Sequence, residues 1–120
     1  MLEARAIRKN IRSSPRKMRL VADLVRGKNV NEALAILRYT PNKAARHVSQ
    51  TLYSAVSNLI YIDEQSDNPG SVDSDTGNVY VKLIFVDQGP VMKRMLPAPQ
   101  GRAYRIRKRM CKLTIVVGAR

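Results

Sequence analysis

The first half of the chain carries apolar residues at intervals of three and four, the spacing of amphipathic helices. A helix is predicted from Ser14-Pro15, a hydroxyl cap followed by a proline suited to the first turn, to a stop at Gly27. A short helix follows from Asn31, its candidate cap, to Arg38. A third helix runs from Pro41 to about Ile62, about 33 Å at 1.5 Å per residue. The expected core-facing positions are Met18, Val21, Leu24 and Val25, with Leu20 beside them, then Ala33, Leu34, Ile36 and Leu37, and then Ala45, Val48, Leu52, Ala55, Val56 and Leu59.

Three other segments alternate with the period of two that is typical of β-strands. Residues 3–12 alternate weakly, with Ile7 and Ile11 on one side, and predict an edge strand. NVYVKLIFVD (78–87) and CKLTIVVG (111–118) are rich in β-branched residues and predict two further strands. In 78–87 both faces are apolar, with Val79, Val81, Leu83 and Phe85 on one and Tyr80, Ile84 and Val86 on the other.

Between these two strands, GPVMKRMLPAPQGRAYRIRKRM contains three prolines, so no helix is expected there. The simplest arrangement joins the strands as one antiparallel pair whose hairpin continues about 33 Å beyond the core, at about 3.3 Å per residue. The expected fold is α+β: a small antiparallel sheet packed on about three helices, with a long extended hairpin projecting from the core. Residues 1–120 are interpreted as one domain, with a core of about 1–85 and 110–120 and a hairpin of about 86–109.

The net charge of the chain indicates that its binding partner is a polyanion. Lys and Arg total 22 against 9 Asp and Glu, a formal charge of +13. Nucleic acid is the first candidate for such a charge, and an anionic membrane surface is the second. Hydrophobic residues make up 44% of the chain, which disfavours full disorder. Trp is absent and Phe occurs once, so aromatic platforms for base stacking are scarce.

The charge is arranged in blocks. Residues 1–60 carry a net +9 and residues 79–120 another +9, whereas residues 61–78 carry −5. The acidic stretch of about 63–78 contains Pro69, Gly70 and Gly77 and is interpreted as an exposed loop that points away from the polyanion. The general behaviour of loops favours the simpler interpretation, a surface insertion with no role of its own.

Two basic motifs suit phosphate groups. On a strand, Arg105, Arg107 and Arg109 share one face at about 6.6 Å intervals, close to the phosphate spacing along a nucleic-acid strand. The alternatives are a solvated basic face and a chance match to a nuclear-localisation pattern. The segment from Ser13 to Lys17 combines a helix N-terminus with two adjacent cations, a ready phosphate site, although capping alone would also explain it. Met92 and Met95 either pack locally under the hairpin or touch RNA bases or an extended peptide.

Enzymatic and metal chemistry have no support in the sequence. With one Cys (Cys111) and one His (His47), neither an internal disulfide nor a metal site is expected. No phosphate-binding glycine loop, nucleophile elbow or paired carboxylate motif occurs, so no cofactor is expected and the protein is interpreted as a non-enzyme. The start MLEARAIRKN has no apolar segment of a secretory signal, and no run is long enough to cross a bilayer. A soluble, intracellular protein is therefore expected.

Two stretches, SSPRKMRLVADLVRGKNVNEALAILRYTPNKAA and FVDQGPVMKRMLPAPQGRAYRIRKRMCKLTIVV, closely resemble the bacterial-type L-twenty-two family of large-subunit ribosomal proteins. The similarity runs from about Arg5 to Val117. The resemblance implies an α/β domain that binds 23S-type ribosomal RNA, supports subunit assembly and sends a long hairpin along the polypeptide exit tunnel. Expected partners are this RNA, neighbouring ribosomal proteins and the nascent polypeptide, in a cytoplasmic or organellar ribosome.

The basic pattern and the resemblance together predict two sets of site residues. Contacts with RNA are expected from Arg8, Arg12, Ser14, Arg16, Lys17, Arg19, Lys28, Lys82, Lys93, Arg94, Arg102, Arg105, Arg107, Lys108 and Arg109. The tunnel-lining tip is expected to comprise Met92, Lys93, Arg94, Pro97, Gln100, Gly101 and Arg102.

The chain departs from the family pattern at the tip. Family members often carry basic residues where Ala98 and Gln100 stand, and Pro99 is added here. A less positive and stiffer tip than in those family members is therefore expected. The acidic stretch is also longer than the usual connection.

Two other classes remain as alternatives. A free regulatory protein binding DNA or messenger RNA would need a dimer and base-reading residues on a groove-entering helix, and neither is evident. A membrane-surface protein would need an unburied apolar helix face, whereas the helices here are better used as core. No stable homo-oligomer is expected.

Overall fold

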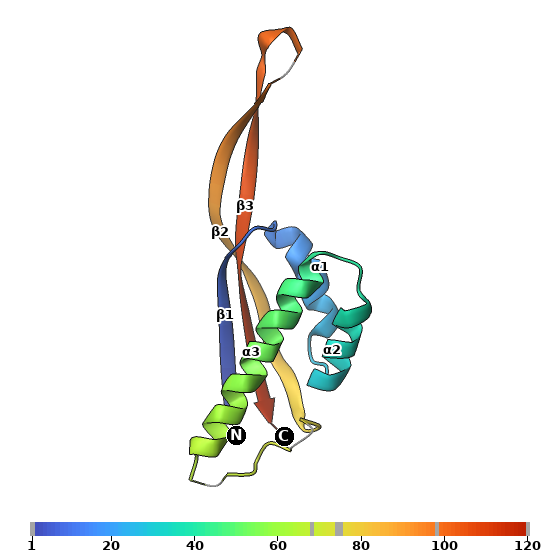
Figure 1. Ribbon diagram of the computed structural model, residues 1–120, viewed down its shortest axis with the longest axis vertical. Helices are drawn as coiled ribbons and strands as arrows, with labels where there is room; N and C mark the ends of the chain where they lie inside the picture. Colours follow the sequence, from blue (N-terminus) through green and yellow to red (C-terminus); the bar gives the residue numbers. More distant parts are fainter. Residues whose placement is uncertain (1, 68, 74–75, 98, 120) are drawn as a thin grey trace.

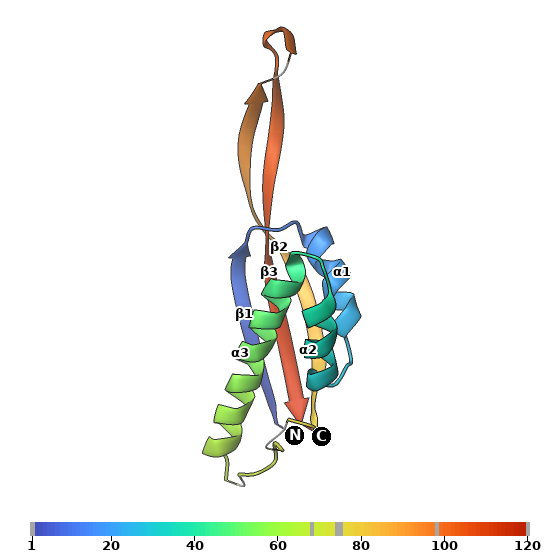
Figure 2. The same cartoon turned by 45° about the vertical axis from the view of Figure 1, so that its right-hand side comes forward.

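The computed structural model describes residues 2–67, 69–73, 76–97 and 99–119. Along the chain lie β1 (Glu3–Ile11), α1 (Pro15–Val25), α2 (Val30–Tyr39), α3 (Ala44–Gln65), β2 (Val79–Pro97), a 3-10 turn (Pro99–Gly101) and β3 (Ala103–Ala119). The strands form one antiparallel sheet in the order β1-β3-β2, and the helices cover one of its faces (Figures 1 and 2). The predicted α+β class with a projecting hairpin is confirmed.

The hairpin makes the molecule long. Its extents are 69 × 27 × 15 Å and its radius of gyration is 17.8 Å. A compact chain of this length would have a radius of gyration of roughly 14 Å. β2 and β3 stay paired as far as Pro97 and Ala103, well beyond the last helix, while both chain termini lie at the opposite end (Figure 1).

Local sequence explains where the helices begin. The Oγ of Ser14 accepts a hydrogen bond from the Lys17 N–H (3.3 Å), and Gly27 adopts φ 76° just after α1. The cap of α2 is Asn29 rather than the predicted Asn31, because the Asn29 Oδ1 accepts from the Asn31 N–H (2.9 Å). α3 begins three residues later than predicted and ends three residues later, at Gln65.

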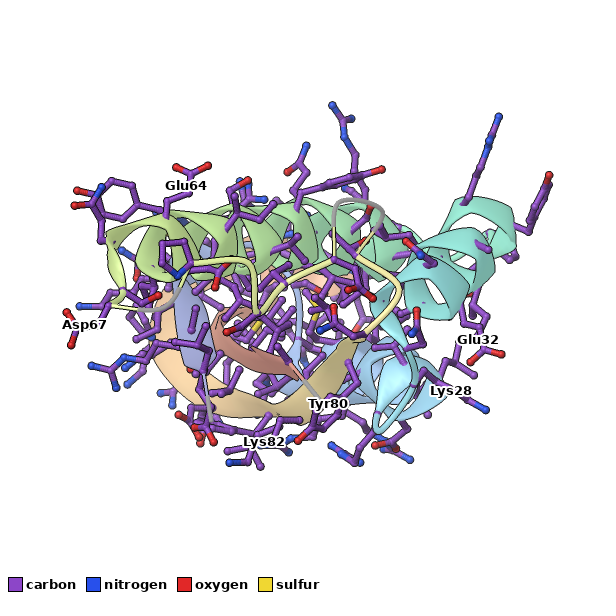
Figure 3. All side chains as sticks on the ribbon, turned by 90° about the horizontal axis from the view of Figure 1, so that it is seen from below. Lys28, Glu32, Glu64, Asp67, Tyr80 and Lys82 are labelled. Carbon is purple, nitrogen blue, oxygen red and sulfur yellow. The ribbon has the colours of Figure 1, made fainter. Side chains whose placement is uncertain are left out.

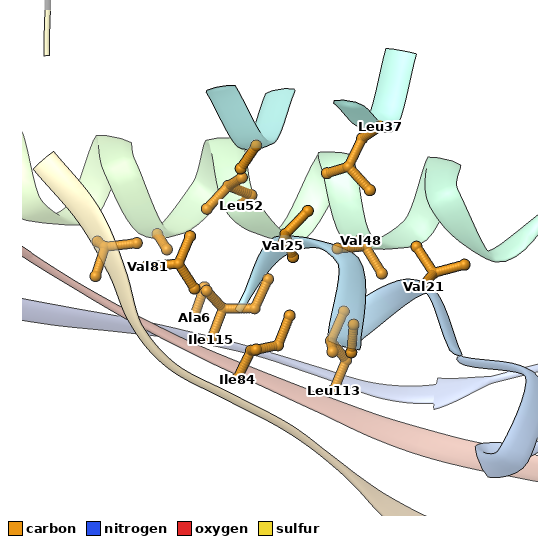
Figure 4. Packing of buried hydrophobic residues seen from close by; sticks show 14 of the residues in the cluster. Ala6, Val21, Val25, Leu37, Val48, Leu52, Val81, Ile84, Leu113 and Ile115 are labelled. Carbon is orange, nitrogen blue, oxygen red and sulfur yellow. The ribbon is translucent and has the colours of Figure 1, made fainter. Parts of the chain in front are cut away.

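The core lies between the helices and the covered face of the sheet (Figure 4). Leu52 of α3 and Ile84, Leu113 and Ile115 of the sheet are fully buried there. All six core positions predicted for α3 are buried. In α1 the buried stripe is narrower than predicted, so Leu24 is 45% exposed and Leu20 is also exposed.

Extra residues in β1 and β2 change which side chains face the core. In β1 the register shifts between Arg8 and Ile11, where Asn10 has φ 57°. Ile7 therefore faces outward while Ile11 is buried, and the prediction that they share a side is wrong.

A similar shift lies between Val81 and Leu83 in β2. On the N-terminal side of this shift Val79 and Val81 are buried, and on its C-terminal side the buried residues are Ile84 and Val86. The strict alternation predicted for this strand is therefore wrong, since one additional residue moves Leu83 and Phe85 to the outer face with Tyr80.

A third irregularity separates Gln88 from Val91, where the hairpin leaves the core. A Cβ at Gly89 would lie only 3.1 Å from the Met110 carbonyl carbon, so a glycine is favoured at this position. The next residue, Pro90, has no backbone N–H, so it fits a position where the pairing of the strands is interrupted. All three irregularities place the extra residue in β1 or β2, so β3 alternates without interruption.

The acidic connection is organised by the end of α3. Asp63 is buried, and its carboxylate accepts hydrogen bonds from the N–H groups of Gly70 (3.2 Å) and Ser71 (3.0 Å). The first residues of the predicted loop of 63–78 therefore belong to α3, which ends at Gln65. The Asp63 carboxylate provides the hydrogen-bond acceptors for the backbone of the turn that follows the helix. Asn68, Ser74 and Asp75 of that stretch lie outside the described residues.

Candidate nucleic-acid interface

A basic groove forms where the hairpin leaves the core. It has a volume of about 510 Å³. Four segments line it: the end of β1, the start of α1, the start of α3 and the part of β3 that lies at the base of the hairpin. Figure 1 shows these segments meeting at one level of the molecule. Its cations are Arg12, Lys17, Lys43, Arg107, Lys108 and Arg109.

A second hollow of about 450 Å³ adjoins the first, and Ser14 and Arg109 line both. It adds Arg16 and Arg19 to the basic surface. We name the two adjoining hollows, with the cations that line them, the basic groove. Within the described residues the two ion pairs are Arg26–Asp23 and Lys82–Glu3, so no carboxylate neutralises the groove. Such a surface attracts polyanions.

The start of α1 adds a second source of positive potential. No acidic residue lies in its first turn, and Ser14 occupies the cap position beside both hollows. The N-terminal end of a helix carries a partial positive charge that favours phosphate. The helix and the side chains of Arg16 and Lys17 therefore act in the same direction.

Arg19 also has a structural role. Its Nε and Nη2 donate to the Val86 carbonyl at 3.2 and 2.9 Å, which ties α1 to β2. These two hydrogen bonds hold the guanidinium of Arg19 in place at the edge of the second hollow, although the residue as a whole is exposed.

The hairpin has two chemically different faces because opposed residues of an antiparallel pair lie on the same side. One face pairs Lys93 with Arg107, Met95 with Arg105, and Val91 with Arg109. We name it the basic face. Since β3 alternates without interruption, this face continues the row of Cys111, Leu113 and Ile115 that the helices bury. Past the helices, the same side of β3 carries arginine.

The other face of the hairpin is more apolar. It pairs Leu96 with Tyr104, Arg94 with Ile106, and Met92 with Lys108. Here the Arg94 Nη1 donates to the Lys93 carbonyl (2.9 Å), which folds the guanidinium back along its own strand.

The tip is a tight turn. Pro99–Gly101 forms a 3-10 turn in which Gln100 and Gly101 have φ values of 67° and 72°. The left-handed conformation suits Gly101 but is strained for Gln100. Arg102 follows at the exposed end, and Ala98, where the family pattern was expected to differ, lies outside the described residues.

Three predicted RNA contacts lie away from the groove and the hairpin. Arg8 donates to the Gln50 Oε1 (2.6 Å) and links β1 to α3. Lys82 is paired with Glu3, and Lys28 lies at the end of the molecule that faces away from the hairpin (Figure 3). Lys43, Asn42 and Gln88 line the hollows and were missed, because nothing in their local sequence marks them as neighbours of α1.

His47 and Cys111 have altered pKa values. Burial lowers the pKa of His47, and nearby Arg8, Lys43 and Arg46 lower it further. Burial raises the pKa of the Cys111 thiol, against a smaller opposite effect of Arg19. Both groups therefore favour their neutral forms.

The described residues contain neither a candidate metal site nor a candidate membrane-spanning helix. No group of three or more His, Cys, Asp or Glu residues there could hold a metal ion. None of the helices in those residues is long and apolar enough to cross a membrane.

Comparisons with known proteins show the family to which the chain belongs. The family model described as "Ribosomal protein L22p/L17e" matches residues 6–118. The chain is 55% identical to the "Large ribosomal subunit protein uL22" of Chlorobium chlorochromatii and 53% identical to that of Chlorobaculum tepidum, over 97% of this chain and 92% of each relative. It is 52% identical to the protein of that name from Desulforamulus reducens, over 97% of this chain and 95% of the relative. The chain therefore belongs to the L22p/L17e family of ribosomal proteins.

Proposed function

We propose that this protein is a structural constituent of the large ribosomal subunit, that it binds 23S-type ribosomal RNA and that it supports subunit assembly. The observation that carries the proposal is the basic groove, in which four distant segments bring cations together with no neutralising carboxylate in the described residues. Phosphate contacts from such a surface position RNA segments without reading their sequence.

The hairpin extends the same surface. Lys93, Arg105, Arg107 and Arg109 on its basic face hold RNA on one side, and the tip from Pro97 to Arg102 lines the polypeptide exit tunnel. A two-stranded ribbon with few packed side chains has little stability of its own in water, so contact with RNA fixes its position. In this proposal residues up to about 85 and from about 110 form the core.

Replacing Arg105, Arg107 and Arg109 together by Ala tests the RNA contact. The variant should bind large-subunit RNA more weakly, and the slope of log affinity against log salt should fall by roughly 2 to 3, since each phosphate contact contributes about 0.7 to 0.9. Incorporation into the subunit should fall in parallel. The matched control replaces Arg38, an exposed cation on α2 outside the groove, and should change neither.

Unchanged affinity, salt slope and subunit occupancy in the triple variant would refute the role of the basic face. Recovery of the unsubstituted protein on messenger RNA or DNA rather than in the subunit would favour the regulatory alternative.

A further inference from the structure

The basic groove has an apolar wall as well as cations. Leu20 of α1 lines the first hollow and is 62% exposed, and Ala44 at the start of α3 lines the same hollow. Lys17 precedes Leu20 by three residues, so the two side chains lie on one face of α1. Phosphate groups offer no apolar area against which a leucine could be buried. The first hollow therefore fits a ligand that is anionic in one part and apolar in another.

A side chain that can both donate and accept hydrogen bonds lies beside this wall. Asn42 lines the hollow, and its backbone carbonyl accepts a hydrogen bond from the Ala45 N–H (3.0 Å), which fixes its backbone ahead of α3. Its side-chain amide has no hydrogen-bond partner among the described residues. An amide can pair with the edge of a nucleic-acid base, which also carries donors and acceptors.

The hairpin supplies the remaining chemistry of the hollow through Arg107 and Arg109, which also line it. Guanidinium groups bind phosphate through paired hydrogen bonds, and their planes stack on unpaired RNA bases. The volume of about 510 Å³ lies within the range of about 300 to 1,000 Å³ that is typical of pockets for small organic molecules. The hollow thus has room for a nucleotide rather than for a phosphate group alone.

We propose that the basic groove binds one unpaired nucleotide of ribosomal RNA. This inference rests on the proposed function and specifies which part of the RNA this site takes. The base lies between Leu20 and the guanidinium of Arg107 or Arg109, and Asn42 forms hydrogen bonds with its edge. The phosphates on either side contact the other cations of the groove. The nucleotide must be unpaired, because a paired base is stacked within its helix and cannot enter a hollow.

A photo-crosslinking amino acid in place of Leu20, in purified large subunits, tests the kind of ligand. We expect an adduct with RNA at a single nucleotide, mapped by the position at which reverse transcription stops. In protein-free large-subunit RNA that nucleotide should react with a reagent specific for unpaired nucleotides, and binding of the unsubstituted protein should protect it. The matched control places the same amino acid at Leu24, which is 45% exposed on the same helix and lines neither hollow. It should give no stop at that nucleotide.

Adducts confined to paired nucleotides would show that the groove holds only the backbone of an RNA helix, and they would overturn the inference. An adduct with a protein, or none in subunits that contain the variant, would overturn it as well. Absence of the unsubstituted chain from large subunits would instead refute the proposed function.

Leu20→Ala tests the apolar wall without the crosslinker, in titrations of the purified protein with protein-free large-subunit RNA. Affinity should fall about fivefold, because less apolar area is buried on binding. The slope of log affinity against log salt should stay unchanged, since no phosphate contact is lost, whereas Lys17→Ala should lower it by about 0.7 to 0.9. Leu24→Ala should change neither quantity.

Unchanged affinity of the Leu20→Ala variant would contradict the inference, and so would a fall in its salt slope. This measurement decides the question if the crosslinker variant does not enter subunits. Failure of the unsubstituted protein to bind large-subunit RNA more tightly than an unrelated RNA would refute the proposed function itself.

Discussion

Leu113 and Arg107 lie on the same face of β3, yet they belong to two different regions of the molecule. Leu113 is fully buried beneath the helices, whereas Arg107 is exposed on the hairpin. In the core region, burial of apolar area stabilises the fold by about 25 cal/mol per Å². In the hairpin region the side chains have almost nothing to pack against, and in the proposed function they contribute free energy only by contacting RNA. One uninterrupted strand therefore contributes to the stability of the core and, in that proposal, to the binding of RNA.

Leu113→Ala should cause the largest loss of stability. The substitution removes buried methyl groups and leaves a cavity, which typically costs about 2 to 5 kcal/mol of unfolding free energy. Arg107→Ala on the same face should change it by no more than about 0.5 kcal/mol. Urea denaturation of both variants checks the pair. Similar losses in both would mean that the hairpin is part of the folded core.

Asp63→Ala should have the next largest effect. It leaves the N–H groups of Gly70 and Ser71 without their acceptor, at a cost of about 1 to 3 kcal/mol. Asp73→Ala, at an exposed carboxylate of the same connection, is the control and should be neutral. Equal thermal stability of the two variants would show that the carboxylate of Asp63 does not organise the connection.

Lowering the pH should weaken the core through His47. Its pKa is lowered in the folded protein, chiefly by burial, so below about pH 6.5 the unfolded chain binds a proton that the folded chain does not. Stability should therefore fall as the pH is lowered from 7.5 to 5.5. His47→Gln should show a shallower decline in the same urea titrations, and an identical decline would exclude this histidine as the cause.

Shortening the hairpin should have the smallest effect on the core. Removing Met92–Met95 together with Arg105–Lys108 deletes four opposed pairs and keeps the alternation of faces. The midpoint of thermal unfolding should stay close to that of the whole chain, while passage of nascent polypeptides through the tunnel should change. Loss of cooperative unfolding in the shortened chain would contradict the division into core and hairpin.

Periodicity was enough to predict much of this fold from the sequence. The apolar stripe of α3, the cap at Ser14 and the long hairpin are set by local patterns, and the structure has them. The β-bulges were not predictable, because an extra residue in β1 or β2 is defined only by the pairing of that strand with β3, which the local sequence does not show. Strict alternation therefore placed Ile7 and Leu83 on the wrong sides.

The candidate site was predictable in part for a similar reason. Arg105, Arg107 and Arg109 are spaced along one strand, so their shared face follows from the sequence. The groove itself combines residues from β1, α1, α3 and β3, and their proximity is a tertiary property. Lys43 is absent from the predicted contacts on that account, whereas Lys28 and Lys82, predicted from the basic pattern and the resemblance, lie away from the groove.

In the proposed function, the basic groove and the basic face of the hairpin hold ribosomal RNA. Crosslinking the tagged protein to RNA in its native cells, with sequencing of the bound RNA, tests this most directly. We expect reads concentrated on a few separated segments of large-subunit ribosomal RNA, and their loss when Arg105, Arg107 and Arg109 are replaced by Ala. Reads spread over messenger RNAs, or an unchanged pattern in that variant, would contradict it.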